Sequence, residues 1–261
     1  MTPKLKLATA LSTLAIAASL STGAFAETLR LGTEGAYPPF NYIEADGKIA
    51  GFDVEIGQEL CKRIGEECEV VAQDWDGIIP GLLANKYDFI IASMFITEER
   101  KEQVDFTDPY YLAAMTNVVS KGSDITEFTN EALADKVIGA QSGTTQADYI
   151  EATYPDADVR LYPTQDEVNL DMASGRIDMQ VGDMLPMLDW TKKTEDGACC
   201  ELAGDPITDP AFVGEGVGIA LRQEDDELRE KLNAALAEMR ADGTYKTIND
   251  KYFDIDVYTM K

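Results

Sequence analysis

The stretch that decides the layering of this chain runs from residue 52 to residue 92 and reads FDVEIGQELCKRIGEECEVVAQDWDGIIPGLLANKYDFIIA. It opens with apolar residues at helical spacing up to Ile64, and Gly65 predicts the end of that helix. The pattern then predicts a strand at 68–72, a helix around 78–85 and a nearly all-apolar strand at 89–92. Strands that alternate with helices and are apolar on both faces indicate α/β layering with a parallel sheet.

The segments on either side of this stretch extend the same pattern. An alternating strand is predicted at 28–33, and 34–40 is predicted to be a loop because two adjacent prolines do not fit a strand ladder. The same alternation is predicted again further on, with strands at 136–140, 161–162 and 177–181 and helices at 145–153 and 166–174. The C-terminal part is predicted to hold a strand at 216–221 and a long helix that includes Leu228 to Met239 and stops at Gly243. Two α/β units predict two lobes.

The N-terminus has the features of a secretory signal peptide. Lys4 and Lys6 precede an apolar run from residue 7 to residue 20, and Ala24-Phe25-Ala26 fits the cleavage rule. We therefore predict a signal peptide at 1–26 that is cleaved after Ala26. The next residue is Glu27 and not Cys, which argues against a lipid anchor. No later apolar run approaches the roughly 20 residues of a spanning helix, so the mature protein is expected to be soluble.

Composition excludes several classes of function. The net charge of −26 would repel nucleic acid and anionic lipid and would favour cationic ligands, although acidity can also serve solubility alone. The chain has no histidine, which removes Ser-His-Asp and Cys-His nucleophile pairs and most zinc sites. Carboxylate-only chemistry remains open. We predict no metal, no cofactor and no enzymatic activity.

The four cysteines form two pairs in the sequence. In an oxidising compartment Cys61 and Cys68 are predicted to form a disulfide that closes an eight-residue loop. The adjacent Cys199 and Cys200 leave three alternatives open: a vicinal disulfide, a bond between two molecules, or two free thiols. A metal site is not expected there, because the chain has no histidine and no second thiol pair with suitable spacing.

Several motifs in order along the chain carry a resemblance to one family. They are residues 34–40, Phe52-Asp53, 75–80, 93–100, the cysteine pair at 61–68, and 238–253. On these motifs the chain resembles the polar amino-acid-binding proteins of ABC importers (solute-binding protein family 3), especially the lysine/arginine/ornithine and histidine receptors and their opine-binding relatives.

The resemblance implies an α/β, two-lobed periplasmic-binding-protein fold of type II. Each lobe would be a mixed sheet flanked by helices, and two hinge strands would join the lobes. Here that places lobe one at 27–112 and 214–261 and lobe two at 116–208, with hinges near 112–116 and 208–214. It also implies a location in the periplasm.

The resemblance further assigns the groups that hold the amino-acid backbone of a ligand. Arg100, which follows Thr97 as a predicted helix cap, would clamp the α-carboxylate. The helix start at Thr144, Thr145 and Gln146 would offer amides to the same carboxylate. Asp183 would bind the α-ammonium group.

A second set of residues would select the ligand's side chain. Tyr37 and Trp75 would sandwich it, and Glu34 would face its distal cation. Ser93 is retained from the family pattern and would hold the carboxylate or the ammonium group. Ala92 and Phe95 stand where lysine/arginine/ornithine receptors usually have serines, which leaves the ligand's identity and orientation open.

The predicted function is capture of an amino acid, most of all a basic one, and its delivery to the membrane permease of an ABC importer. Arginine is expected first, then ornithine, lysine and histidine. The protein is expected to be a monomer without a nucleic-acid partner. Two alternatives remain: a cyclohexadienyl dehydratase-like enzyme on the same fold, which a complete clamp of Arg100 and Asp183 disfavours, and an opine receptor, which is disfavoured because Asp183 suits an unsubstituted α-ammonium.

Overall fold

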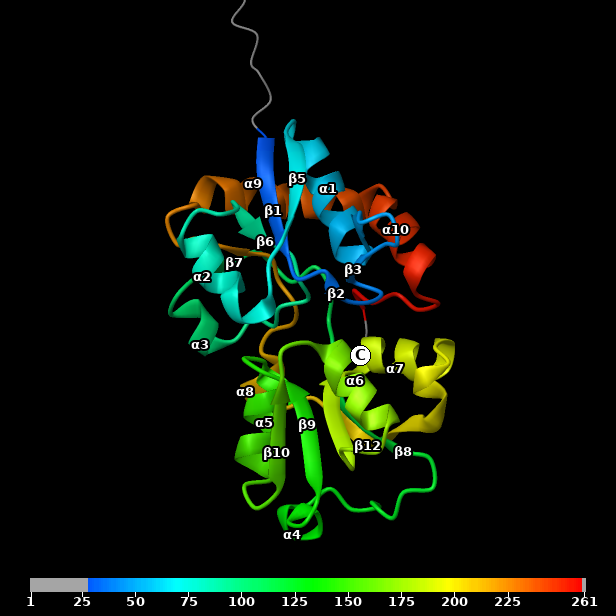
Figure 1. Cartoon of the computed structure of the whole chain (residues 1–261). Helices are drawn as coiled ribbons and strands as arrows, with labels where there is room; N and C mark the ends of the chain where they lie inside the picture. Colours follow the sequence, from blue (N-terminus) through cyan, green and yellow to red (C-terminus); the bar gives the residue numbers. More distant parts are fainter. Residues whose placement is uncertain (1–27, 260–261) are drawn as a thin grey trace, which may run out of the picture.

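A computed structural model describes residues 28–259, which form two α/β lobes stacked on each other (Figure 1). The upper lobe in that view combines the blue and cyan start of the chain with its orange and red end, and the green and yellow middle forms the lower lobe. The predicted fold class is therefore confirmed. The predicted signal peptide lies outside the described residues.

The first lobe is built on a five-stranded sheet with strand order β5-β1-β6-β13-β7. Its strands are β1 (Thr28–Thr33), β5 (Glu67–Ala72), β6 (Phe89–Ile90), β7 (Asp105–Phe106) and β13 (Ala220–Leu221). Its helices are α1 (Phe52–Ile64), the 3-10 turn η1 (Trp75–Gly77), α2 (Ile78–Leu83), α3 (Glu98–Lys101), α9 (Asp226–Ala241) and α10 (Thr244–Tyr252). A small antiparallel sheet lies beside α1 and consists of β2 (Ala36–Tyr37), β3 (Asn41–Ile43) and β4 (Ile49–Ala50).

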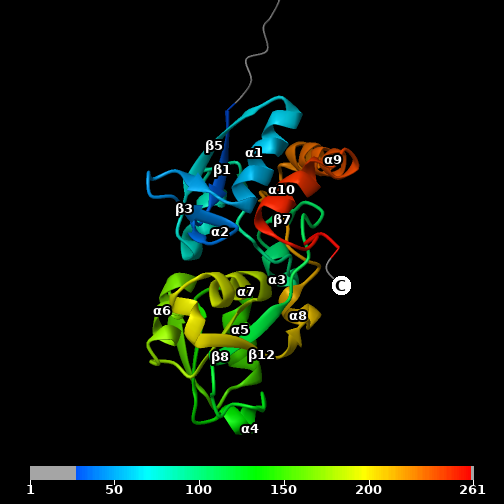
Figure 2. The ribbon, with the colours of Figure 1, turned by 90° about the vertical axis from the view of Figure 1, so that its right-hand side faces the viewer.

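The second lobe has the same plan, with strand order β10-β9-β11-β8-β12. Its strands are β8 (Met115–Ser120), β9 (Val137–Gln141), β10 (Asp158–Tyr162), β11 (Met179–Asp183) and β12 (Cys200–Ile207). Its helices are α4 (Asn130–Leu133), α5 (Thr145–Thr153), α6 (Gln165–Ala173), α7 (Met184–Lys193), the 3-10 turn η2 (Asp196–Cys199) and α8 (Pro210–Val213). The turned view shows α6 and α7 on the side that faces the first lobe (Figure 2).

Both sheets are mixed, as the family resemblance implies, and the strands within the α/β units pair in parallel as predicted. β1 runs parallel to β5 and β6, whereas β13 is antiparallel to β6 and β7. In the second lobe β9 is parallel to β10 and β11, but β8 is antiparallel to β11 and β12. The antiparallel pairs involve β8, β12 and β13, which are the strands next to the two passages between the lobes.

Two local predictions need correction. The predicted loop at 34–40 contains β2, which pairs with β3 while the prolines occupy the turn between them. The predicted strand at 216–221 is regular only at Ala220–Leu221, because Val217 makes isolated bridges to Phe95 and Tyr111 instead of joining a ladder. Those bridges hold Val217, which follows the second passage between the lobes, against residues that precede the first passage.

Close backbone approach fixes α1 over the sheet and against the small hairpin. A β-carbon at Gly57 would collide with the side chain of Leu31 on β1, and one at Gly51 would collide with the carbonyl of Phe40. Gly51 also has φ of 125°, a region that side chains rarely adopt. The first turn of α1 is thereby held next to the hairpin that leads into the cleft.

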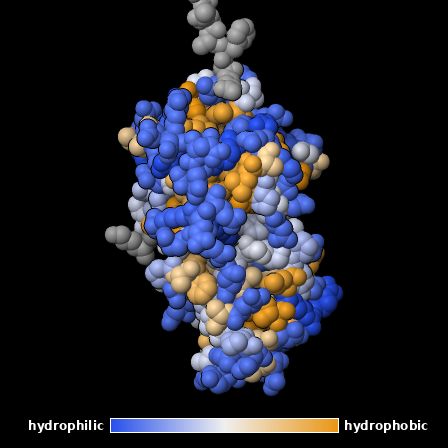
Figure 3. Space-filling model, turned by 90° about the vertical axis from the view of Figure 1, so that its left-hand side faces the viewer, coloured by the Kyte–Doolittle hydropathy of each residue, from blue (hydrophilic) through white to orange (hydrophobic). Residues whose placement is uncertain are grey.

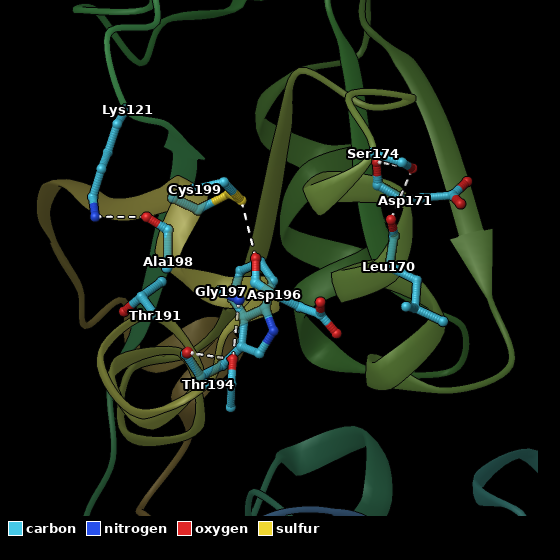
Figure 4. Close-up of a disulfide and its surroundings, with 12 residues drawn as sticks. Lys121, Leu170, Asp171, Ser174, Thr191, Thr194, Asp196, Gly197, Ala198 and Cys199 are labelled. Atoms are coloured by element: carbon cyan, nitrogen blue, oxygen red, sulfur yellow. Dashed lines mark hydrogen bonds between the residues drawn. A yellow bond between two sulfur atoms is a disulfide. The ribbon is translucent and has the colours of Figure 1, made fainter.

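The structure forms two disulfides, and the first of them is the predicted one. Cys61 on α1 bonds to Cys68 on β5, with Cα atoms 5.9 Å apart. Cys199 and Cys200 bond to each other where η2 passes into β12, so the structure favours the vicinal alternative. Figure 4 shows this corner, where Lys121 Nζ donates to the carbonyl of Ala198 at 2.7 Å.

The face of the molecule that Figure 3 draws is mostly hydrophilic. On the face drawn in Figure 3, apolar residues form separate small patches on each lobe. Among residues 28–259, no helix combines the length and apolarity needed to cross a membrane.

Removing the Cys61–Cys68 disulfide should lower the free energy of unfolding by about 2.5 kcal/mol, the loop-entropy estimate for an eight-residue loop. The double variant Cys61→Ser/Cys68→Ser tests this by urea denaturation. Neither cysteine lines the interlobe pocket, so the pocket's ligand affinity should be unchanged. An unfolding midpoint equal to that of the unmodified protein would contradict the estimate.

Candidate functional site

A pocket lies between the lobes and is lined from both of them. Its first-lobe residues are Glu34, Tyr37, Trp75, Ala92, Ser93, Phe95 and Arg100. Its second-lobe residues are Gln141, Thr144, Thr145, Gln146, Gln165 and Asp183. The structure thus brings together all nine residues that the sequence predicts as ligand-binding. Their contact with a ligand remains a prediction.

Arg100 provides the pocket's positive charge. It lies on the short helix α3, where Thr97 caps the helix by accepting from the Arg100 backbone N–H at 3.3 Å, as predicted. Its guanidinium donates to the Phe95 carbonyl at 3.0 Å and lies 5.4 Å from the ring centre of Trp75. Within the described chain no carboxylate forms an ion pair with it. Burial lowers the pKa of Arg100 to about 10, so the group stays charged at neutral pH.

Asp183 is a buried acid that forms no ion pair with the described residues, although the charge of Arg100 opposes the rise of its pKa. It ends β11, precedes α7 and is 3 % exposed. The Tyr37 hydroxyl donates to one oxygen at 2.8 Å, and the Gln146 side-chain amide donates to the other. No Lys or Arg of residues 28–259 pairs with it, and burial raises its pKa to about 7. Because Tyr37 belongs to the first lobe and Gln146 to the second, this carboxylate joins the two walls of the pocket.

Glu34 is a second pocket acid for which residues 28–259 provide no ion pair. It is 8 % exposed and accepts from the Gln141 side-chain amide at 2.6 Å. Burial raises the pKa of Glu34 to about 7, and the nearby carboxylates of Asp166, Asp74 and Asp76 add to the rise. A cation placed beside Glu34 would reverse this effect and favour the ionised form.

The start of α5 faces the same pocket. The Thr144 hydroxyl caps the helix by accepting from the Ala147 backbone N–H, and Thr144 and Thr145 are both buried. The first amides of a helix have no partner within that helix, so they suit an anion. The side chain of Gln146 bonds to Asp183, which leaves its backbone amide for the predicted role.

Aromatic rings form the walls, and two of them come from the predicted set. The Trp75 indole N–H donates to the Gly143 carbonyl across the cleft at 2.9 Å, and the Ser142 hydroxyl donates to Asp76 next to it at 2.8 Å. Ala92 and Phe95, the departures from the family pattern, both line the pocket and are 3 % and 2 % exposed. Phe95 therefore adds an apolar surface where a hydroxyl would otherwise stand.

Two lining residues, Gln141 and Gln165, escaped the sequence analysis. Gln141 is the last residue of β9. Ligands of α/β proteins bind at the carboxyl ends of parallel strands, so the position of Gln141 at such an end could have marked it as a site residue. Gln165 begins α6 and donates to Gln180 in the core at 2.8 Å. No motif marks it, because its position depends on how α6 packs.

The raised pKa values of Glu34 and Asp183 predict how stability depends on pH. Both pKa values are about 7 in the folded protein and near 4 in an unfolded chain, so the folded state binds more protons between those pH values. The free energy of unfolding should therefore fall as pH rises from 4 to 7. Urea denaturation of the ligand-free protein at pH 5 and pH 8 measures the difference. Glu34→Gln/Asp183→Asn should reduce it, and an unchanged difference in that variant would contradict the assignment.

Comparison with known proteins places these features in one family. The model of the bacterial extracellular solute-binding proteins, family 3, matches residues 29–255. The L-arginine-binding protein of Pseudomonas aeruginosa is 43 % identical over 242 residues, which cover 92 % of this chain and 93 % of that protein.

Two solved structures are similar throughout. An ancestral arginine-binding protein bound to arginine has a TM-score of 0.79 at 39 % identity, covering 87 % of this chain and 98 % of that one. An ancestral amino-acid-binding protein, a precursor of cyclohexadienyl dehydratase, has a TM-score of 0.78 at 34 % identity, covering 87 % and 96 %.

Proposed function

Because this chain belongs to family 3 of the bacterial extracellular solute-binding proteins, we propose that it is a periplasmic receptor that closes two lobes around one basic amino acid. The observation that carries this proposal is the charge of the pocket. Arg100, Asp183 and Glu34 line one cavity, and none of them has an ion-pair partner in the described chain. One positive and two negative groups complement a ligand with one carboxylate and two cationic groups, which describes a basic amino acid.

Each charge has a distinct task in this proposal. Arg100 and the first amides of α5 hold the α-carboxylate from opposite lobes. Asp183, steadied by Tyr37, takes the α-ammonium group. Glu34 takes the distal cation of the side chain at the other end of the pocket. Tyr37, Trp75 and Ser93 complete the proposed ligand-binding set.

Arginine is the proposed first choice, ahead of ornithine, lysine and histidine. A planar guanidinium gains stacking on an aromatic wall as well as a charge-assisted bond, whereas an ammonium group gains mainly the charge. The similarity to the L-arginine-binding protein of Pseudomonas aeruginosa supports arginine as the first choice.

The lobes are proposed to move as units, with lobe one at 27–112 and 214–261 and lobe two at 116–208. The hinges near 112–116 and 208–214 are the two passages between the sheets. We further propose that residues 1–26 are a signal peptide cleaved after Ala26. The mature monomer would then deliver its ligand to the permease of an ABC importer.

Binding without chemistry is proposed over a dehydratase-like activity. Both ends of an α-amino acid have a charged partner here, and Asp183 is enclosed by Tyr37 and Gln146, which suits an unsubstituted ammonium group. Incubation with prephenate or arogenate discriminates the two functions, because formation of an aromatic product would support the enzyme.

Replacing Arg100 by Ala should weaken arginine binding by at least about 3 kcal/mol, roughly a hundredfold, because two charge-assisted hydrogen bonds to the carboxylate are lost. Isothermal titration calorimetry measures the change. Arg30→Ala is the matched control, since Arg30 pairs with Asp88 on the same lobe and does not line the pocket. Binding by Arg100→Ala within tenfold of the unmodified protein would show that the site is elsewhere.

Replacing Glu34 by Gln keeps the side chain's shape and removes its charge. Arginine should bind more weakly by roughly 1.5–3 kcal/mol, the range for hydrogen bonds to charged groups, while glutamine should be much less affected. Calorimetry with both ligands makes the comparison. Equal losses for the two would mean that Glu34 does not recognise a cation.

A further inference from the structure

Asp53 is a buried carboxylate that lies outside the ligand pocket. It is the second residue of α1, is fully buried and does not line the pocket. In the part of the chain that the structure describes, no Lys or Arg pairs with it. Burying a charge without a cation is costly, so its surroundings must compensate for the lost water.

Three side chains from three separate segments donate to Asp53. The Asn41 amide and the Ser93 hydroxyl donate to one oxygen at 2.9 Å and 3.0 Å, and the Tyr110 hydroxyl donates to the other at 2.6 Å. The start of α1 adds the favourable end of its helix dipole. These contacts satisfy both oxygens, so the carboxylate and its three donors hold one another in place.

The titratable groups that face Asp53 are phenols. Tyr110 and Tyr111 precede β8, and Tyr245 lies on α10; burial raises the pKa of each, so all three stay neutral. Burial also raises the pKa of Asp53, to about 6, which leaves it ionised at neutral pH. The cluster therefore holds a single negative charge.

Two of the donors lead directly to pocket loops. Asn41 also accepts from the backbone N–H of Gly35, the neighbour of Glu34, at 2.8 Å. Ser93 lines the pocket with φ of 54°, a conformation that is uncommon for residues other than glycine. Its backbone N–H donates to the Tyr110 hydroxyl at 3.2 Å, so the Ser93 loop is held at two points by one cluster.

We propose that Asp53 is a positioning residue for ligand binding: through Asn41 and Ser93 its carboxylate sets the spacing between two loops of the pocket. One loop carries Glu34 at the proposed cation end, and the other carries Ser93 and runs on to Phe95, whose carbonyl accepts from Arg100. This inference rests on the proposed function, because the spacing matters for a ligand that touches both loops at once.

The experiment compares Asp53→Ala with Asp53→Asn by calorimetry with arginine. Asp53→Ala removes both acceptors and should raise the Kd at least tenfold. Asp53→Asn keeps an oxygen for Asn41 and Ser93, and its amide can donate to the Tyr110 hydroxyl, so it should restore the Kd to within threefold. Urea denaturation at the same pH shows that the titrated protein is folded.

Asp88→Ala is the matched control. Asp88 accepts hydrogen bonds from Arg30 on the same lobe and is absent from the pocket, so its loss should reduce stability without changing the Kd. If Asp53→Ala does not fold, Asn41→Ala replaces it, because that variant cuts the connection to Gly35 and leaves Asp53 intact. It should raise the Kd at least fivefold.

Two results would overturn the inference. A Kd within threefold of the unmodified protein in folded Asp53→Ala, or in Asn41→Ala if it is used, would show that the cluster is only structural. An Asp53→Asn variant as weak as Asp53→Ala would show that charge matters and hydrogen-bond geometry does not. Failure of the unmodified protein to bind arginine would instead refute the proposed function, so the two failures are distinguishable.

Discussion

The central constraint on this structure is the free-energy cost of burying charged side chains without an opposite charge beside them. Arg100, Asp183 and Glu34 are removed from water at the junction of the lobes, and neutral donors or a carbonyl are the groups that touch them. Such contacts stabilise a charge less than an opposite charge does, and the perturbed pKa values record the difference. A ligand that supplies the missing charges stabilises the assembly by the same physical effect.

The two-sheet architecture makes this enclosure possible. Each lobe has its own sheet with parallel strands, and the strand ends that face the cleft carry polar residues, as at Gln141 on β9 and Asp183 on β11. The pocket is lined from both lobes. Hydrogen bonds across the gap, such as Tyr37 to Asp183, form where the two halves meet.

Local signals allowed much of the fold to be predicted from the sequence. The spacing in α1 and its stop at Gly65, the cap at Thr97 and the start of α5 all depend on residues within one or two turns. The antiparallel strands β8 and β12 were missed, because their pairing joins segments that are about 80 residues apart and no periodicity records it.

The site was predicted to a similar extent and for similar reasons. Charged residues at strand ends and helix starts carry a recognisable pattern, and the family resemblance ordered them. Gln165 and the cluster around Asp53 carry none, because their roles arise from side chains that meet only after the lobe has packed. The left-handed backbone conformation of Ser93 likewise depends on contacts with residues far away in the sequence, so no local pattern predicts it.

The indole of Trp75 gives the molecule a built-in optical reporter. The chain has two tryptophans, and the other one, Trp190, lies in the core of the second lobe at 8 % exposure. Trp75 instead bridges the gap by donating to Gly143, and separating the halves would break that bond and expose the ring. The wavelength and intensity of emission from Trp75 would then follow the opening of the cleft without any attached dye.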